Sequence, residues 1–133
     1  MAAAPISELA GLRLLVVEDE YMVAEHITML LEGFGCDVAG PVARIEEALA
    51  VVGEGGLDGA LLDTNLNGHS SAPIAAALHA ASVPFVVVTG YGARVLADQD
   101  LDQAPRIIKP FSTADLEAVL IAALANRPAS GEA

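Results

Sequence analysis

Basic residues are scarce in this sequence. Its 133 residues include six lysines and arginines against eighteen aspartates and glutamates, which gives a formal net charge of −12 at pH 7. Proteins bind nucleic acids and anionic membranes largely through clusters of Lys and Arg, and the sequence contains no such cluster. We therefore expect no nucleic-acid partner and no attraction to a membrane surface, and we expect proteins or cations as partners instead.

Disulfides and membrane-spanning segments are equally unsupported. Cys36 is the only cysteine, so no internal disulfide can form, which fits the reducing cytoplasm. No apolar run approaches the roughly 18 residues of a membrane span, and no charged-then-apolar signal peptide opens the sequence. We expect a cytoplasmic protein without membrane insertion, in which Cys36 is a small buried core residue.

Apolar residues, by contrast, are abundant. They make up 54% of the chain, while charged residues make up 18%, and this balance excludes a disordered chain. A chain of this length forms one domain readily and two only with difficulty. Because both ends lack apolar periodicity, we expect a loose N-terminus over residues 1–10, one domain over 11–126 and a loose tail over 127–133.

Short apolar runs alternate with amphipathic patterns along the chain. The runs predicted as strands are residues 12–17, 36–39, 59–62, 85–88 and 106–108. Helical spacing follows them, as in Val23, Ile27 and Leu30, which recur at i, i+4 and i+7. Ser71 and Ser112 are predicted to cap the helices after the third and fifth runs. The alternation predicts a parallel sheet with helices on both faces.

Polar side chains follow four of these five runs. Glu18 and Asp19 come after the first run, Asp63 after the third, Thr89 after the fourth and Lys109 after the fifth. In an open parallel sheet, ligands bind outside the carboxyl ends of the strands. Three carboxylates, one hydroxyl and one ammonium are therefore expected to converge on one edge of the sheet.

This set of groups favours phosphoryl chemistry. Carboxylates brought close together repel one another, and a divalent cation relieves the repulsion. A small number of hard oxygen ligands suits Mg²⁺, which keeps several waters. Lys109 and Thr89 would supply a positive charge and a hydroxyl donor to the oxygens of a phosphoryl group at Asp63. The sequence therefore predicts a phosphoryl-transfer site, in which positioning and charge neutralisation carry most of the catalysis.

Four segments at the strand ends carry a family resemblance. They are VVEDE at 16–20, LLDTNLNG at 61–68, VVVTGYG at 86–92 and IIKPF at 107–111. Each is weak alone, but all four occur in one order, each at a strand end. Over roughly residues 12–125 the sequence resembles the receiver domains of bacterial two-component response regulators. The resemblance implies an α/β, flavodoxin-like receiver fold with a five-stranded doubly wound parallel sheet in the strand order 2-1-3-4-5.

The resemblance also implies a metal site. Asp19 and Asp63 would bind Mg²⁺ directly, together with the main-chain carbonyl of Asn65. Glu18 would act on the ion through a water molecule. Mg²⁺ is therefore the cofactor that the resemblance implies.

Roles in phosphoryl transfer follow from the same resemblance. Asp63 would accept a phosphoryl group from a sensor histidine kinase or a histidine phosphotransfer protein. Thr89 and Lys109 would bind the phosphoryl oxygens. The chain would act as a phosphoacceptor signalling domain that promotes only its own phosphorylation and dephosphorylation, rather than as an enzyme with a separate substrate.

The finer pattern is similar to one receiver subgroup. Common receivers carry an aromatic residue three positions before the lysine, where this sequence has Arg106. The segment PFVVVTGYG at 84–92 resembles the signature of the FATGUY receivers, which are often paired with histidine kinases of the HWE or related classes. We interpret Thr89 and Tyr91 as a modified switch pair in place of the usual threonine–aromatic pair.

From this resemblance we expect a single-domain response regulator without an attached output domain. Its signal would leave by protein–protein contact, or the domain would act as a phosphoryl relay or sink. The main alternative is a receiver-like docking module that is not phosphorylated. A flavodoxin-type carrier is disfavoured because acidic residues at 18–20 would repel the FMN phosphate. An aspartate-nucleophile phosphatase would usually carry its Asp pair after the first strand.

Overall fold

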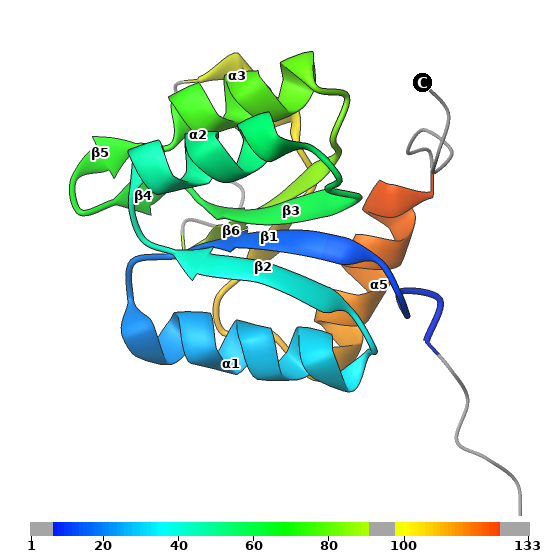
Figure 1. The fold of residues 1–133 in the computed structure, drawn as a ribbon. Helices are drawn as coiled ribbons and strands as arrows, with labels where there is room; N and C mark the ends of the chain where they lie inside the picture. The colour runs from blue at the N-terminus through cyan, green and yellow to red at the C-terminus, as the bar shows by residue number, and fades with distance from the viewer. Residues whose placement is uncertain (1–6, 91–97, 126–133) are drawn as a thin grey trace, which may run out of the picture.

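The structure is built on a five-stranded parallel sheet with helices on both faces (Figure 1). It is a computed structural model that describes residues 7–90 and 98–125. The strands of the sheet are β1 (Arg13–Val17), β2 (Asp37–Val42), β3 (Gly59–Asp63), β6 (Phe85–Thr89) and β7 (Arg106–Ile108). Their spatial order is β2-β1-β3-β6-β7, which confirms the predicted order 2-1-3-4-5.

Helices α1 (Tyr21–Gly33) and α5 (Thr113–Leu124) cover one face of the sheet, and α2 (Ile45–Glu54) and α3 (Ala72–Ala80) cover the other (Figure 1). The short helix α4 (Gln99–Gln103) packs beside α3. Both faces are therefore covered, which explains why the strands read as continuous apolar runs.

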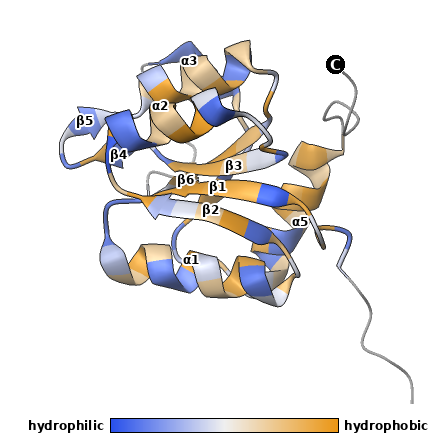
Figure 2. Cartoon of the chain, viewed as in Figure 1, coloured by the Kyte–Doolittle hydropathy of each residue, from blue (hydrophilic) through white to orange (hydrophobic). Residues whose placement is uncertain are grey.

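Alternate residues of each central strand serve two separate hydrophobic cores. In β1, Leu14 and Val16 lie in the core shared with α1 and α5, whereas Leu15 and Val17 lie in the core shared with α2 and α3. All four side chains are buried because successive side chains of a strand point to opposite faces. Figure 2 shows β1 and β3 largely in hydrophobic colours, while the covering helices carry both hydrophilic and hydrophobic residues.

Strand β2 differs from its prediction. It begins at Asp37 rather than Cys36 and continues through Gly40 and Pro41 to Val42. The pairing with β1 is irregular here, because Leu15 lies opposite Ala39 while Val17 lies opposite Val42. A proline fits this position because β2 is an edge strand, where a missing N–H does not interrupt a ladder.

The two serines predicted to cap helices behave differently. Ser112 does cap α5, since its Oγ accepts a hydrogen bond of 3.0 Å from the backbone N–H of Asp115. Ser71 precedes α3 but makes no side-chain cap bond, so its predicted role is wrong. Its hydroxyl is fully buried and has no hydrogen-bond partner among the described residues.

The segment after Asp63, which lies outside the five predicted strands, forms a short hairpin. Strands β4 (Asn65–Leu66) and β5 (His69–Ser70) pair antiparallel, and Asn67 and Gly68 make the turn between them. Both turn residues have positive φ, at 52° and 86°. This is the Asn-Gly pattern of a two-residue hairpin turn, in which both central residues need the left-handed region.

Two further expectations concern burial and membranes. Cys36 is 8% exposed, and burial raises the pKa of its thiol to about 11, so it is an unreactive core residue at neutral pH. Within residues 7–90 and 98–125, none of the helices is long and apolar enough to cross a membrane.

Candidate functional site

The carboxyl ends of four parallel strands bring the predicted polar residues to one edge of the sheet. The register of β1 and β3 places Val17 opposite Leu62, so the residues that follow, Glu18 and Asp63, lie side by side. The backbone N–H of Glu18 donates to the carbonyl of Val42 at 3.0 Å, which extends the β1–β2 ladder to the site. These ladder contacts hold the first acidic residue on a rigid element.

Three carboxylates form one cluster at this edge. Glu18, Asp19 and Asp63 each offer an oxygen, and these atoms all lie within 4.8 Å of one another. Glu18 and Asp63 are buried, with exposed fractions of 3% and 8%, while Asp19 is half-buried. A spacing of this kind allows one small cation to contact oxygens from more than one of the three side chains.

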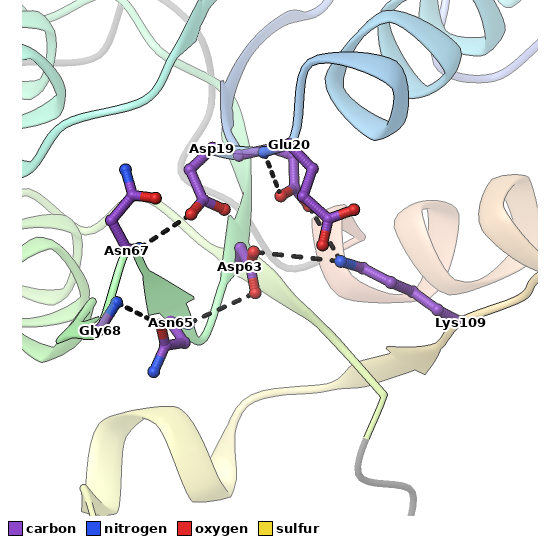
Figure 3. A network of polar contacts seen from close by, with 8 residues as sticks. Asp19, Glu20, Asp63, Asn65, Asn67, Gly68 and Lys109 are labelled. Atoms are coloured by element: carbon purple, nitrogen blue, oxygen red, sulfur yellow. Dashed lines mark hydrogen bonds and ion pairs between the residues drawn. The ribbon is translucent and has the colours of Figure 1, made fainter.

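Among the described residues, Lys109 is the only basic residue whose side chain contacts this cluster. Its Nζ lies 3.1 Å from Oε1 of Glu18 and 4.0 Å from Oδ2 of Asp63 (Figure 3). The backbone N–H of Lys109 donates to the carbonyl of Thr89 at 2.9 Å, which fixes the end of β7 against the end of β6. The ammonium group therefore reaches the carboxylates from the end of β7, the strand at one side of the sheet.

Backbone N–H groups satisfy one oxygen of each carboxylate. Asp63 Oδ1 accepts from the N–H of Asn65 at 3.3 Å, and Glu18 Oε2 accepts from the N–H of Glu20 at 3.0 Å. Asp19 Oδ2 accepts from the N–H of Asn67 at 2.8 Å (Figure 3). Each carboxylate is thereby oriented by a donor that carries no charge, and its second oxygen is left for a cation or for Lys109.

The electrostatics of the cluster favour a cation. Burial raises the pKa of Asp63 to about 7, and the hydrogen bond and negative charge of Glu18 add to the rise, against the opposing effects of Lys109 and the Asn65 N–H. For Lys109, burial alone lowers the pKa, but the charges of Asp63 and Glu18 outweigh it and leave the pKa above its ordinary value. The lysine is therefore cationic, yet one positive charge does not neutralise the cluster.

The remaining predicted residues lie around the same opening. Thr89 is buried at the end of β6, and Gly90 beside it lines the pocket. Among the described residues, no heavy atom lies within 4 Å of a Cβ added at Gly90. The Oδ1 atom of Asn65 accepts from the N–H of Gly68 at 2.8 Å. Tyr91, the other half of the predicted switch pair, lies outside the described residues.

The opening is a pocket of about 410 Å³ at the sheet edge. It is lined by Asp19, Glu20, Asp63, Thr64, Asn65, Asn67, Gly90 and Lys109. Glu20 and Asn67 were not singled out from the sequence. The acidic run at 18–20 was a signal for Glu20, and the Asn-Gly pair was a signal for the turn, but no sequence pattern reveals that the Asn67 N–H meets Asp19.

The fit to Mg²⁺ is good on chemical grounds. The clustered donors are carboxylate oxygens, which are the ligands this hard cation prefers, and the partly open pocket leaves room for the waters it retains. Burial, with a further contribution from Glu18, raises the pKa of the Asp63 carboxyl, and a divalent charge beside it would favour the ionised form.

Fold and site together match a known family of signalling domains. Residues 14–121 match the family model described as the response regulator receiver domain. That span covers most of the chain, so this chain belongs to the response regulator receiver domains.

Several relatives are similar over most of the described fold. The solution structure of SdrG from Sphingomonas melonis Fr1 matches with a TM-score of 0.76 and 37% identity, over 86% of this chain and 97% of that chain. The phyllosphere-induced regulator PhyR of Methylorubrum extorquens is 33% identical over 114 residues, which are 84% of this chain and 43% of PhyR. The response regulator PhyR from Brucella abortus matches with a TM-score of 0.77 and 28% identity, over 90% of this chain and 50% of that chain. This chain therefore spans half or less of the PhyR proteins.

Proposed function

We propose that this receiver domain accepts a phosphoryl group on Asp63 in a Mg²⁺-dependent reaction, with a phosphohistidine of a sensor kinase or phosphotransfer protein as the donor. The observation that carries the proposal is the cluster of Glu18, Asp19 and Asp63, with an oxygen of each within 4.8 Å of the others and with Lys109 beside it. Membership in the receiver family and similarity to proteins named as regulators support it.

The metal ligands of this proposal are those that the receiver resemblance implies, and the clustered carboxylate oxygens support them. Asp19 and Asp63 would bind the ion directly, together with the backbone carbonyl of Asn65, and Glu18 would act through a water. Glu18 suits the outer position because both of its oxygens already have partners, Lys109 and the N–H of Glu20. When bound, Mg²⁺ would neutralise charge on the carboxylates and on the oxygens of the transferred phosphoryl group.

Asp63 would act as the nucleophile. One carboxylate oxygen attacks the phosphorus of the phosphohistidine, a P–O bond forms as the P–N bond breaks, and the electron pair of that bond stays on the departing imidazole nitrogen. The N–H of Asn65 donates to the other carboxylate oxygen, Oδ1, and so holds the carboxylate in a fixed orientation. Attack requires the ionised carboxylate, and the raised pKa of Asp63 leaves part of the population protonated at neutral pH when no cation is bound.

Lys109 and Thr89 would receive the phosphoryl oxygens. Lys109 Nζ lies 4.0 Å from Oδ2 of Asp63, close enough to pair with an oxygen attached there after a small movement away from Glu18. Thr89 ends the strand next to β3, and the absence of a side chain at Gly90 leaves the approach open. The signal would then leave by protein–protein contact, or the phosphoryl group would be passed onward or hydrolysed.

The test is phosphorylation in the presence and absence of Mg²⁺. The full chain is incubated with a radiolabelled phosphorylated histidine kinase or a small-molecule phosphodonor, and acid-labile label is followed on the protein. We expect labelling that needs Mg²⁺ and is lost in Asp63→Asn, while Glu25→Gln on the exposed side of α1 retains it. Full labelling of Asp63→Asn would overturn the assignment, and absence of labelling with any donor would favour a docking module.

A further inference from the structure

The β4–β5 hairpin packs against the domain and contacts the acidic cluster. Leu66 is 2% exposed and packs in the core shared with α2 and α3, so its side chain fixes the hairpin against that core. Its far end is tied to the start by the N–H of Ser71, which donates to the carbonyl of Thr64 at 3.2 Å. The hairpin therefore has a fixed position beside Asp63.

The register of the hairpin directs the backbone of Asn65 toward the acidic cluster. A two-residue turn makes Leu66 and His69 the hydrogen-bonded pair next to the turn, so the next pair, Asn65 and Ser70, is the one that does not exchange hydrogen bonds. The N–H and C=O of Asn65 then point away from β5. The N–H does reach Asp63, at 3.3 Å, which places the carbonyl of the same residue on the same side.

The turn itself holds Asp19. The N–H of Asn67 donates to Asp19 Oδ2 at 2.8 Å across 48 residues of sequence. Asp19 is half-exposed and lies among two other carboxylates, so repulsion would favour a rotation of its side chain toward solvent. The backbone donor opposes that rotation, and it leaves the other oxygen of Asp19 facing the cluster (Figure 3).

The donor is available only because of the backbone conformation of the turn. Asn67 and Gly68 have φ of 52° and 86°, a region that L side chains other than Asn and Asp rarely occupy. The N–H of Gly68 also engages Oδ1 of Asn65 at 2.8 Å, which turns that side chain back over the hairpin. The turn thus determines the placement of Asp19 and of the Asn65 side chain together.

We propose that Asn67 and Gly68 are positioning residues for the metal site: the Asn67–Gly68 turn holds Asp19 in the orientation that binds Mg²⁺, although neither turn residue is a ligand. This inference rests on the proposed function, because it takes the acidic cluster as a Mg²⁺ site. It adds that the affinity for the ion is set partly by the conformation of a turn on the surface of the domain.

The first experiment compares two glycines that have similar positive φ values but lie at opposite ends of the strands. Gly68 and Gly56 have φ of 86° and 83°, both are exposed, and a Cβ at either would have no heavy atom within 4 Å. Gly56 precedes β3 and so lies near the amino ends of the strands, away from the acidic cluster at their carboxyl ends. Mg²⁺ is titrated into Gly68→Val, Gly56→Val and the unsubstituted chain by calorimetry. We expect the dissociation constant to rise about tenfold in Gly68→Val, from the backbone strain of a β-branched residue at positive φ, and to stay unchanged in Gly56→Val.

A second pair of variants isolates the N–H of the turn. Asn67→Gly keeps the donor and tolerates positive φ, so its affinity for Mg²⁺ should stay within about twofold of the unsubstituted chain. Asn67→Val resists that conformation and should lose affinity as Gly68→Val does. A measurement without metal accompanies both: amide exchange at Asn67 should be slow in the unsubstituted chain and faster in Asp19→Ala, because its acceptor is gone.

The outcomes separate the two proposals. If the unsubstituted chain binds no Mg²⁺, the metal site and the positioning role both fail. If the unsubstituted chain binds Mg²⁺ but Gly68→Val and Asn67→Val bind it equally well, the metal site stands and the positioning role is overturned. Equal losses in Gly68→Val and Gly56→Val would also overturn it, since the effect would then come from general destabilisation. Amide exchange at Asn67 that is unaffected by Asp19→Ala would show that the turn does not hold Asp19.

Discussion

Lys109 lies closer to Glu18 than to Asp63: its Nζ is 3.1 Å from Oε1 of Glu18 and 4.0 Å from Oδ2 of Asp63. The pairing is asymmetric because Glu18 is almost fully buried and needs a compensating charge, while Asp63 faces the pocket. Lys109 is therefore held next to Asp63, the proposed phosphoacceptor, without pairing closely with it. A small movement would carry the ammonium from one carboxylate to an oxygen bound at the other.

Removing this charge should separate metal binding from phosphorylation. Lys109→Met keeps the length of the side chain and removes a cation near the acidic cluster, so Mg²⁺ should bind about threefold to tenfold more tightly. Phosphorylation of Asp63 should fall by about a hundredfold, since a positioned charge on the transferring group is lost. Calorimetric Mg²⁺ titration and rates of label transfer measure the two effects. A parallel loss of both would mean that Lys109 chiefly supports the fold of the site.

The two acidic neighbours should contribute unequally to metal binding. In the proposed site, Asp19→Asn would remove a charged direct ligand, whereas Glu18→Gln would change a residue that acts through water, for which a loss of about tenfold is expected. Mg²⁺ titration of both variants should show the larger loss at Asp19. A larger loss in Glu18→Gln would reverse the assigned ligand order.

The raised pKa of Asp63 makes the protein without metal less stable as pH rises. Its folded-state pKa of about 7 exceeds the ordinary aspartate pKa of 3.8, so the folded state binds the proton more tightly than the unfolded state. The penalty for ionising Asp63 is absent below the lower value and grows as pH rises to the higher one. In EDTA at about pH 8, Asp63→Asn should raise the free energy of unfolding by about 1–3 kcal/mol, with little change at about pH 4.

Denaturant unfolding at both pH values measures this effect, with Glu25→Gln as the control for an exposed carboxylate. Mg²⁺ should stabilise the unsubstituted chain and should stabilise Asp63→Asn much less, because the ion binds the folded state through that carboxylate. Equal stability of Asp63→Asn and the unsubstituted chain at high pH would show that Asp63 is already ionised without strain.

Two serine-to-alanine substitutions should change stability in opposite directions. Ser112→Ala removes the cap of α5 and should destabilise the chain by about 1 kcal/mol. Ser71→Ala removes a fully buried hydroxyl that has no partner among the described residues, so its effect should be between neutral and about 1 kcal/mol stabilising. Thermal and denaturant unfolding compare the two. A cost at Ser71 equal to that at Ser112 would indicate that its hydroxyl is hydrogen-bonded in solution.

The sequence predicted the sheet and most of its edge chemistry because both depend on local order along the chain. Five apolar runs specify buried parallel strands, and the residue after each strand must lie at the carboxyl edge whatever the details of packing. Asp63 and Lys109 meet at 4.0 Å for that reason alone, although 46 residues of chain separate them.

Details that depend on three-dimensional packing could not be predicted. Ser71 and Ser112 both precede a helix, yet only Ser112 has the extended backbone of an N-cap, with ψ of 162° against 9° at Ser71. The contact of the Asn67 N–H with Asp19 involves a backbone atom, which every residue except proline carries, so no residue type indicates it. The continuation of β2 through Pro41 depends on a break in its register with β1, which no sequence pattern indicates.

The irregular β2 strand has a consequence for how this domain meets other molecules. Exposed sheet edges invite pairing with strands of other chains, and a proline or a bulge blocks it. Here one edge carries Gly40 and Pro41 with a break in the ladder register, and the other edge, β7, is only three residues long. Neither edge offers a long regular row of free N–H and C=O groups. Within the described residues, the sheet is therefore protected at both edges against growing by strand addition.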